Sequence, residues 1–280
     1  MQGNRFRNMT ESALVEIVGI AIFAALVVLI ADLTKPQLNG VPLIAVGIVL
    51  AFIPALLWLV AFYRQDRLEP EPKQYIAGMF ILGAILAQAI GQPIIHDLFR
   101  IQDWASNNLL LGFLGSIFIV GIVQEFLKYA AVRYTIFGSA EFDEPIDGII
   151  YSAAAGLGYA TMLNIQYVVS NGGVDLGVGA VRCAVEALAQ ASTAGVVGYF
   201  LGQAKFNKMG PVWLPVGLVI AASLNGLISL LLERAPQLGT RYGFNIWAAL
   251  IAAVIVAGAI FATLLTIMNR LNNRPTARNA

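Results

Sequence analysis

Eight apolar stretches, each long enough to cross a bilayer, follow one another along the chain with only short connections between them. A hydrocarbon core of about 30 Å needs roughly 20 apolar residues in a helix. The stretches are residues 13–33, 42–63, 75–95, 109–137, 148–170, 179–202, 211–232 and 246–269. The alternation of polar and apolar residues expected of barrel strands is absent. The sequence therefore predicts an all-α polytopic transmembrane bundle of about eight spans, with residues 1–280 forming a single integral membrane domain.

Composition supports this class and excludes others. The chain is 59% hydrophobic and only 12% charged, whereas about a quarter of the residues in soluble domains are charged. The formal net charge of +1 leaves no basic excess for binding nucleic acid, so DNA and RNA are excluded as partners. Cys183 is the one cysteine, which excludes an internal disulfide and a CxxC motif.

The distribution of lysine and arginine predicts the orientation. Most of the 17 Lys and Arg residues fall at the termini and in the connections that share their side of the membrane. Positive residues accumulate in cytoplasmic segments. We therefore expect a protein integral to the cell (inner, cytoplasmic) membrane, with both termini cytoplasmic.

Polar side chains inside the predicted spans mark the candidate site, because such groups are costly in lipid unless they are paired or hydrated. Glu125 and Lys128 are three residues apart on a helix, and Gln124 and Lys128 are four apart, so Lys128 can reach both side-chain carbonyls. Arg182, Glu186 and Gln190 step by four residues along one helix face. Further polar residues in the spans are Asn164, Gln166, Ser223, Asn225 and Ser229. We expect these groups to converge on a hydrated cavity within a catalytic-like core over residues 109–232.

A structural interpretation of the same residues stays open. Buried Gln, Asn and Ser often form hydrogen bonds between membrane helices, and a Glu and an Arg four residues apart can neutralise each other. The glycines Gly156, Gly158, Gly195, Gly198 and Gly202 are typical of close helix packing, since no strand precedes them as in a phosphate-binding loop.

Four short motifs give a family resemblance. They are QEFLK at 124–128, EPIDGIIY at 144–151, GLGYATMLN at 156–164 and DRLEPEPK at 66–73. In this order and spacing, over roughly residues 60–230, the chain resembles the PrsW family of intramembrane proteases, relatives of the CAAX-prenyl endopeptidases and bacteriocin-processing membrane peptidases. The resemblance implies hydrolysis of a peptide bond in a membrane-spanning protein or peptide, which in this family is often an anti-sigma factor.

The resemblance also implies roles for individual residues. Glu125 would be the base that activates water and Lys128 would orient it, while Asn164, Gln190 and Asn225 would donate hydrogen bonds to the scissile carbonyl. The sequence departs from the family pattern where Gln124 replaces the first Glu of a pair and Gln190 replaces a His. Leu163 stands where the family has a Glu or His.

These departures affect the chemistry, because Gln cannot accept a proton at ordinary pH and is a poor zinc ligand. Active relatives would use a divalent metal such as zinc or a glutamate mechanism, and Glu125 and Gln190 are only weak metal candidates here. Three interpretations stay open: a PrsW-type protease with a partly substituted site, a non-catalytic membrane scaffold or binding protein using the same polar cavity, and a transporter. The transporter is disfavoured because no inverted repeat is visible. The sequence does not distinguish natural glutamines from engineered ones at 124, 166 and 190.

Overall fold

The protein is described from a computed structural model that covers residues 40–65, 70–105, 108–173, 178–234 and 246–273, with a few positions between 22 and 33. Within these residues the chain is helical, with turns between helices and no strand, as predicted. The α-helices are α2 (Val41–Tyr63), α3 (Lys73–Leu86), α4 (Ile101–Trp104), α5 (Leu109–Gly115), α6 (Ile122–Tyr134), α7 (Asp147–Ser170), α8 (Val178–Phe206), α9 (Trp213–Ser229) and α11 (Ile246–Asn272). π-Helical segments η1 (Ala87–Gly91), η2 (Pro93–Leu98), η3 (Ser116–Gly121) and η4 (Leu230–Arg234) adjoin α3, α5 and α9.

Five helical stretches are long and apolar enough to cross a membrane: Val41–Tyr63, Lys73–Trp104, Leu109–Tyr134, Trp213–Leu232 and Trp247–Asn272. They agree with five of the predicted spans and support an integral membrane protein. Helices α7 and α8 coincide with two more and are equally long, but their many Ala, Gly and Ser residues make them less apolar. The predicted span at 13–33 lies largely outside the described residues, so the number eight stays a prediction.

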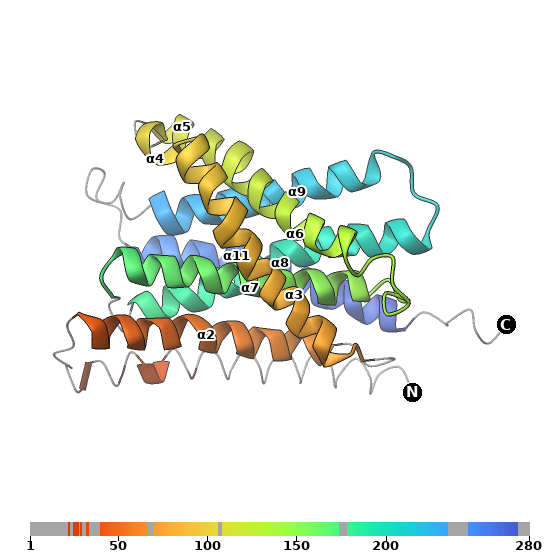
Figure 1. Cartoon of the computed structure of the whole chain (residues 1–280), viewed down its shortest axis with the longest axis horizontal. Coiled ribbons are helices and arrows are strands. Elements are labelled where there is room, and N and C mark those ends of the chain that lie inside the picture. Colours follow the sequence, from red (N-terminus) through yellow and green to blue (C-terminus); the bar gives the residue numbers. More distant parts are fainter. Residues whose placement is uncertain are drawn as a thin grey trace.

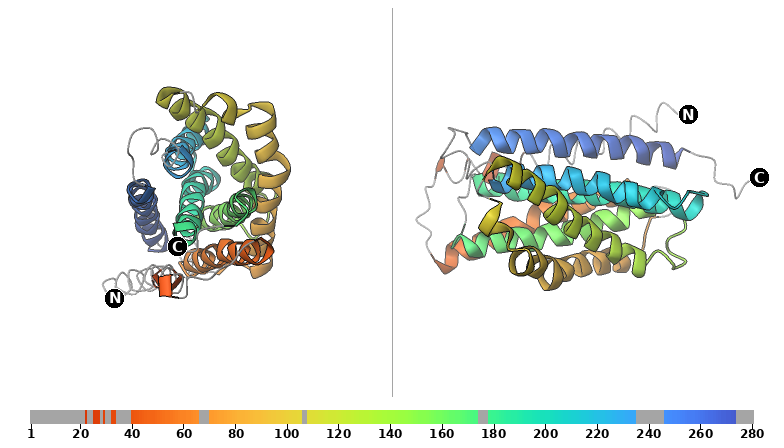
Figure 2. Two further views of the ribbon diagram at one scale, coloured as in Figure 1. Left: turned by 90° about the vertical axis from the view of Figure 1, so that its left-hand side faces the viewer. Right: turned by 90° about the horizontal axis from the view of Figure 1, so that it is seen from above.

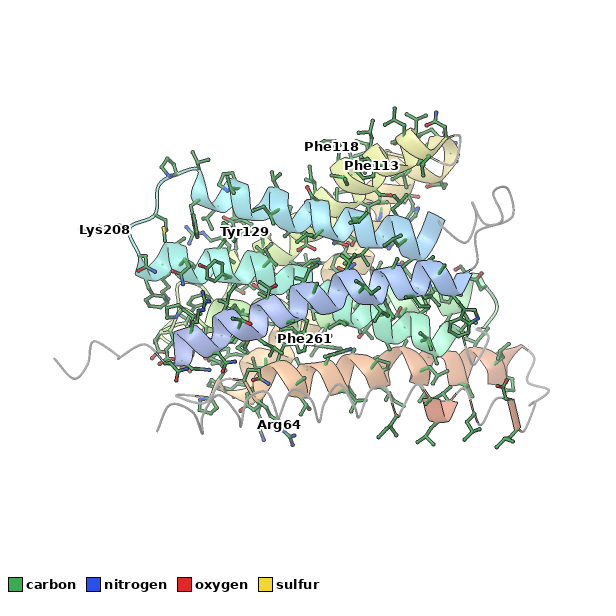
Figure 3. All side chains as sticks on the ribbon, turned by 180° about the vertical axis from the view of Figure 1, so that it is seen from behind. Arg64, Phe113, Phe118, Tyr129, Lys208 and Phe261 are labelled. Atoms are coloured by element: carbon green, nitrogen blue, oxygen red, sulfur yellow. The ribbon has the colours of Figure 1, made fainter. Side chains whose placement is uncertain are left out.

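Helix α8 lies in the middle of the bundle. In the end-on view α7, α9, α11 and α2 surround it (Figure 2, left). Helices α3 and α5–η3–α6 cross the others obliquely (Figure 1). Apolar side chains such as Phe113 and Phe118 point away from the bundle (Figure 3) and are exposed, as expected for a surface that faces lipid. The central position of α8 allows its polar residues to contact several helices at once.

The bundle has two ends, which we name after the ends of α7. At the Ser170 end, α7 ends and α8 begins close to the start of α2, where Gly173 adopts a positive φ of 125° and packs against Leu43. At the Asp147 end, α7 begins and α8 ends. Helix α11 runs from the Ser170 end to the Asp147 end (Figure 2, right).

Glycines bring the backbones of the site-bearing helices into direct contact. A Cβ added to Gly156 would collide with the backbone carbonyl of Gln190 on α8, and one added to Gly198 would collide with the backbone of Gly148 on α7. A Cβ on Gly121 would likewise meet the carbonyl of Ala222 on α9. The close-packing role predicted for glycine is confirmed at Gly156 and Gly198. These contacts fix α8 and α9 relative to the helices that carry the other polar residues.

Polar contacts tie the Asp147 end together. The Tyr151 hydroxyl donates a hydrogen bond to the Glu71 carboxylate, which joins the segment before α3 to α7. Lys205 Nζ donates to the backbone carbonyl of Phe137 at 2.7 Å and to that of Phe142. Burial raises the pKa of the Glu71 carboxyl above its ordinary value, against the opposing effect of the bond from Tyr151. This end therefore contains a buried acid whose ionisation is disfavoured.

Candidate functional site

Five polar side chains from three helices meet in the interior of the bundle, and we call them the polar cluster. They are Gln124, Glu125 and Lys128 of α6, Gln190 of α8 and Asn225 of α9. None of the five is more than 2% exposed. The expected convergence of polar groups from several spans therefore occurs for these residues, and Glu125 faces the interior rather than the headgroups.

Lys128 connects α6 to α8. Its Nζ donates to Glu125 Oε1 at 2.5 Å and to Gln190 Oε1 at 2.6 Å. The predicted contact with Glu125 is present, but the second partner of Lys128 is Gln190 instead of Gln124. Helix spacing allows both arrangements on α6, and the proximity of α8 decides between them.

Gln190 and Asn225 join the three helices through their amide groups. Gln190 Nε2 lies 2.8 Å from Gln124 Oε1 and 3.0 Å from Glu186 Oε1. Asn225 Nδ2 donates to Gln124 Oε1 at 3.0 Å and to Glu125 Oε1 at 2.7 Å. Gln124 thus acts as an acceptor for α8 and α9, which an amide oxygen with two lone pairs can do.

The two carboxylate oxygens of Glu125 have different surroundings. Oε1 accepts hydrogen bonds from Lys128 and Asn225, whereas Oε2 is buried and has no hydrogen-bond partner in the part of the chain that the structure describes. Buried polar atoms without a partner are uncommon, because losing water without compensation costs free energy. The bonds to Oε1 hold the carboxylate in place and leave Oε2 as the oxygen that can accept a proton.

Two of the predicted polar residues lie apart from the cluster. Asn164 Nδ2 donates to the backbone carbonyl of Cys183 at 3.0 Å, a contact that joins α7 to α8. Gln166 forms a hydrogen bond with Gln88 near the Ser170 end. In the described part of the chain, neither residue forms a hydrogen bond with a member of the cluster. Both are amide side chains within a predicted span, as Gln190 and Asn225 are.

Glu186 is a candidate residue that the sequence analysis left outside the catalytic set. It is 4% exposed and its Oε1 accepts a hydrogen bond from Gln190 Nε2. It also lines a pocket at the Ser170 end. The signal in the sequence was its position four residues before Gln190, which places both side chains on one face of α8.

Comparison with known families identifies the family of this chain. Residues 71–259 match the model of the PrsW family intramembrane metalloproteases. The chain belongs to the PrsW family. The matched region includes every residue of the polar cluster.

Curated PrsW relatives are moderately similar to this chain. It is 30% identical over 202 residues to Protease PrsW of Geobacillus kaustophilus, covering 70% of this chain and 86% of that relative. It is 30% identical over 175 residues to Protease PrsW of Bacillus subtilis, covering 62% and 76%. The Clostridioides difficile Protease PrsW is 29% identical over 162 residues, covering 56% and 66%. No solved structure matches the chain significantly. The relatives support a protease function in the membrane.

A metal ion, which the description of the PrsW family implies, does not fit the residues of this cluster. Zinc prefers imidazole nitrogen, thiolate sulfur and carboxylate oxygen. Among the described residues no three His, Cys, Asp or Glu side chains gather into a metal-binding group. The hydrogen-bond partners of Glu125 Oε1 are the ammonium of Lys128 and the amide of Asn225, and the amides of Gln124 and Gln190 complete the cluster. The cluster thus presents amides, one ammonium and one carboxylate, which is not the donor set of a zinc site.

Proposed function

We propose that this PrsW-family chain is a membrane-embedded endopeptidase that hydrolyses a peptide bond in a membrane-spanning protein, with Glu125 as the general base. The observation that carries the proposal is the asymmetry of the Glu125 carboxylate. Two donors fix Oε1, while Oε2 is buried and without a partner. A carboxylate held in this way can take a proton from a water molecule beside it.

The proposed reaction proceeds through a tetrahedral intermediate. Glu125 Oε2 accepts a proton from water as the water oxygen bonds to the scissile carbonyl carbon. The amide NH₂ groups of Gln190 and Asn225 donate to the developing oxyanion. The proton then passes from Glu125 to the leaving nitrogen as the carbon–nitrogen bond breaks. Lys128 is a positioning residue, because it bonds Glu125 and Gln190 together.

Cleavage of a reporter in proteoliposomes tests this proposal. The substrate would be a single-span protein with a fluorophore at each side of its transmembrane segment, mixed with purified chain. We expect cleavage that Glu125→Gln abolishes and that Asp103→Asn leaves unchanged. Asp103 is a matched control because it is a carboxylate in an exposed ion pair with Arg100 at 2.7 Å. Unchanged cleavage by Glu125→Gln would refute the role of Glu125.

A second candidate function is that of a non-cleaving membrane scaffold, which would bind a transmembrane segment at the same place. The observation that favours it is the bonding among the amides of Gln124, Gln190 and Asn225, which already satisfies the groups that the mechanism needs as donors. Restoring the family residues with Gln124→Glu and Gln190→His separates the two candidates. Cleavage only by the double variant indicates a silenced protease, and cleavage by neither form favours the scaffold.

We also propose an orientation of the chain in the cell membrane. With both termini cytoplasmic in the inner membrane, the Asp147 end faces the cytoplasm and the Ser170 end faces outward. The substrate would then be a membrane protein with a segment that reaches the outer side, a requirement that an anti-sigma factor anchored in the membrane would meet. Labelling of single introduced cysteines at Asn171 and Lys208 with an impermeant reagent in intact cells tests the orientation. We expect only the cysteine at 171 to react.

A further inference from the structure

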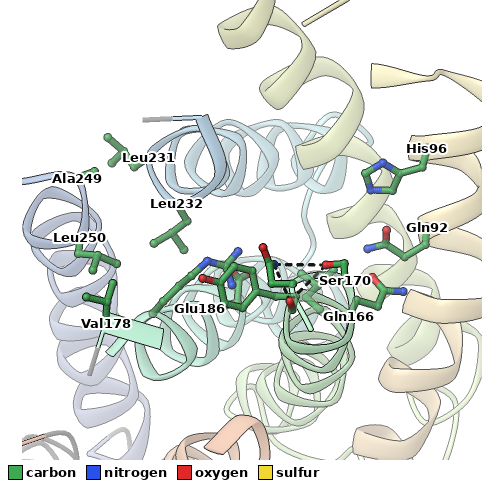
Figure 4. A pocket seen from close by; sticks show the side chains of 14 residues that line it. Gln92, His96, Gln166, Ser170, Val178, Glu186, Leu231, Leu232, Ala249 and Leu250 are labelled. Atoms are coloured by element: carbon green, nitrogen blue, oxygen red, sulfur yellow. Dashed lines mark hydrogen bonds between the residues drawn. The ribbon is translucent and has the colours of Figure 1, made fainter. Parts of the chain in front are cut away.

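A pocket of about 570 Å³ opens at the Ser170 end of the bundle. Its size lies within the range of about 300–1,000 Å³ that is common for ligand sites. One wall is apolar and consists of Leu231 and Leu232 of η4 with Ala249 and Leu250 of α11 (Figure 4). A ligand must therefore present an apolar surface on one side.

The opposite wall is polar. Figure 4 shows Gln92 and His96 from the segment after α3 together with Gln166 and Ser170 of α7 on the side of the pocket away from the leucines. Amide and hydroxyl groups can both donate and accept hydrogen bonds. Non-helical backbone is tolerated at membrane depth only where such groups satisfy it. The polar wall thus suits a peptide segment that has left the helical conformation.

Among the described residues that line the pocket, Arg182 is the one arginine. Its guanidinium carbon lies 3.8 Å from the centre of the Tyr167 ring, a cation–π contact that fixes its position. Its Nη1 is buried and has no hydrogen-bond partner, and Arg182 forms no ion pair with any residue that the structure describes. Among the described residues, no carboxylate therefore pairs with Arg182 to offset the burial of its Nη1.

Glu186 connects the pocket to the polar cluster. Glu186 lies one helical turn after Arg182, lines the pocket and accepts a hydrogen bond from Gln190 Nε2 at 3.0 Å. A segment bound against Arg182 would therefore extend toward Gln190 and Glu125. The Glu186 carboxylate also limits the charge of the ligand, because it would repel a group carrying two negative charges more strongly than one carrying a single charge.

We propose that this pocket recognises an acidic residue of the substrate peptide, with Arg182 binding the Asp or Glu carboxylate through charge-assisted hydrogen bonds. The inference rests on the proposed function and adds a substrate preference to it. The single arginine, the neighbouring carboxylate and the surrounding amides suit a monoanionic side chain flanked by peptide groups. A phosphate site would gather several cations instead.

A binding experiment with two matched peptides tests the proposal. Each is a fluorescent Leu/Ala transmembrane peptide, identical except for Asp or Asn two residues inside its outer end. Fluorescence anisotropy in nanodiscs of neutral lipid measures the Kd of each peptide for the full chain. We expect the Asp peptide to bind about tenfold more tightly, which corresponds to about 1.4 kcal/mol, because only its carboxylate forms charge-assisted hydrogen bonds with Arg182.

Variants assign the preference to Arg182. Arg182→Gln should bind the Asp and Asn peptides equally, and Arg182→Lys should retain part of the preference because it keeps the charge. Arg100→Gln is the matched control, since Arg100 is exposed and already paired with Asp103, and it should retain the full preference. Equal binding of both peptides by the unmodified chain would overturn the proposal, as would a preference that survives Arg182→Gln.

Three further outcomes separate this inference from its alternatives. The first outcome is that neither the unmodified chain nor Arg182→Gln distinguishes the Asp peptide from the Asn peptide. If short-chain phosphatidic acid then displaces the peptide from the unmodified chain but not from Arg182→Gln, the pocket binds lipid phosphate and the inference is wrong. A preference for Asp in the Glu125→Gln variant, which cannot cleave by the proposed mechanism, would support the pocket independently of hydrolysis. If the chain cleaves the reporter but binds the Asp and Asn peptides equally, the inference about the pocket is wrong and the proposed function is unaffected.

Discussion

The polar cluster and the pocket are neighbours along α8, connected by the hydrogen bond from Gln190 to Glu186, yet they differ in how their polar groups are paired. In the cluster, Lys128, Gln190 and Asn225 each bond to two or more partners, and Glu125 Oε2 is the oxygen left without one. In the pocket, Arg182 stacks on the Tyr167 ring, and its Nη1 has no hydrogen-bond partner among the residues that the structure describes. The contrast suggests that the cluster is preorganised by its own residues, whereas the pocket is completed by a ligand.

The largest expected effect is on the ion pair of the cluster. Lys128→Met should lower the free energy of unfolding by about 3–5 kcal/mol, because it leaves the Glu125 carboxylate buried without its cation. Adding Glu125→Gln to Lys128→Met should recover much of the loss, since no uncompensated charge then remains. Unfolding in detergent measures both variants. A small loss in the single variant would mean that the pair is not buried together.

The next effect concerns the backbone contact that positions Gln190. Gly156→Ala should cost about 1–3 kcal/mol, because the added Cβ collides with the Gln190 carbonyl and forces α7 and α8 apart. Gly258→Ala is the matched control, as nothing lies within 4 Å of a Cβ at that position, and it should cause no loss. Thermal unfolding of the two variants measures the difference. Equal stability would show that the close approach does not fix the cluster.

A smaller effect is expected in the pocket. Arg182→Gln removes the contact with Tyr167 and should change stability by only roughly 0.5–1 kcal/mol in the absence of ligand. The same unfolding measurement applies. A loss as large as that of Lys128→Met would contradict the contrast between the two regions, because it would make Arg182 part of a tightly paired structure.

The smallest effect lies at the Asp147 end and depends on pH. The pKa of Glu71 is raised in the folded state, so the folded protein binds the proton more tightly than the unfolded chain does. Stability from this group should therefore be full below the ordinary value of 4.5 and be lost as pH rises through the folded pKa. Glu71→Gln keeps an acceptor for Tyr151 and should remove this slope. A chemical-denaturation series across mildly acidic pH measures it, and an unchanged slope would assign it to another group.

Much of the bundle was predictable because its signals are local. The lengths of the apolar stretches predicted α2, α7, α9 and α11 within a few residues, since the thickness of the hydrocarbon core sets helix length. The i, i+3 spacing of Glu125 and Lys128 predicted their contact, and the spacing of four residues placed Glu186 beside Gln190. These relations depend only on the helical repeat within one segment.

Other features depended on how the helices pack. Asn164 and Asn225 are both amides in apolar spans, yet only Asn225 faces Glu125, because the contact of Gly121 with Ala222 turns that face of α9 toward α6. The second partner of Lys128 was likewise decided by the close approach of α8. The sequence by itself determined the spans and which residues share a helix face, since both follow from local periodicity. Only the tertiary structure decided which faces meet, because the rotation and spacing of packed helices arise from contacts between residues far apart in the chain.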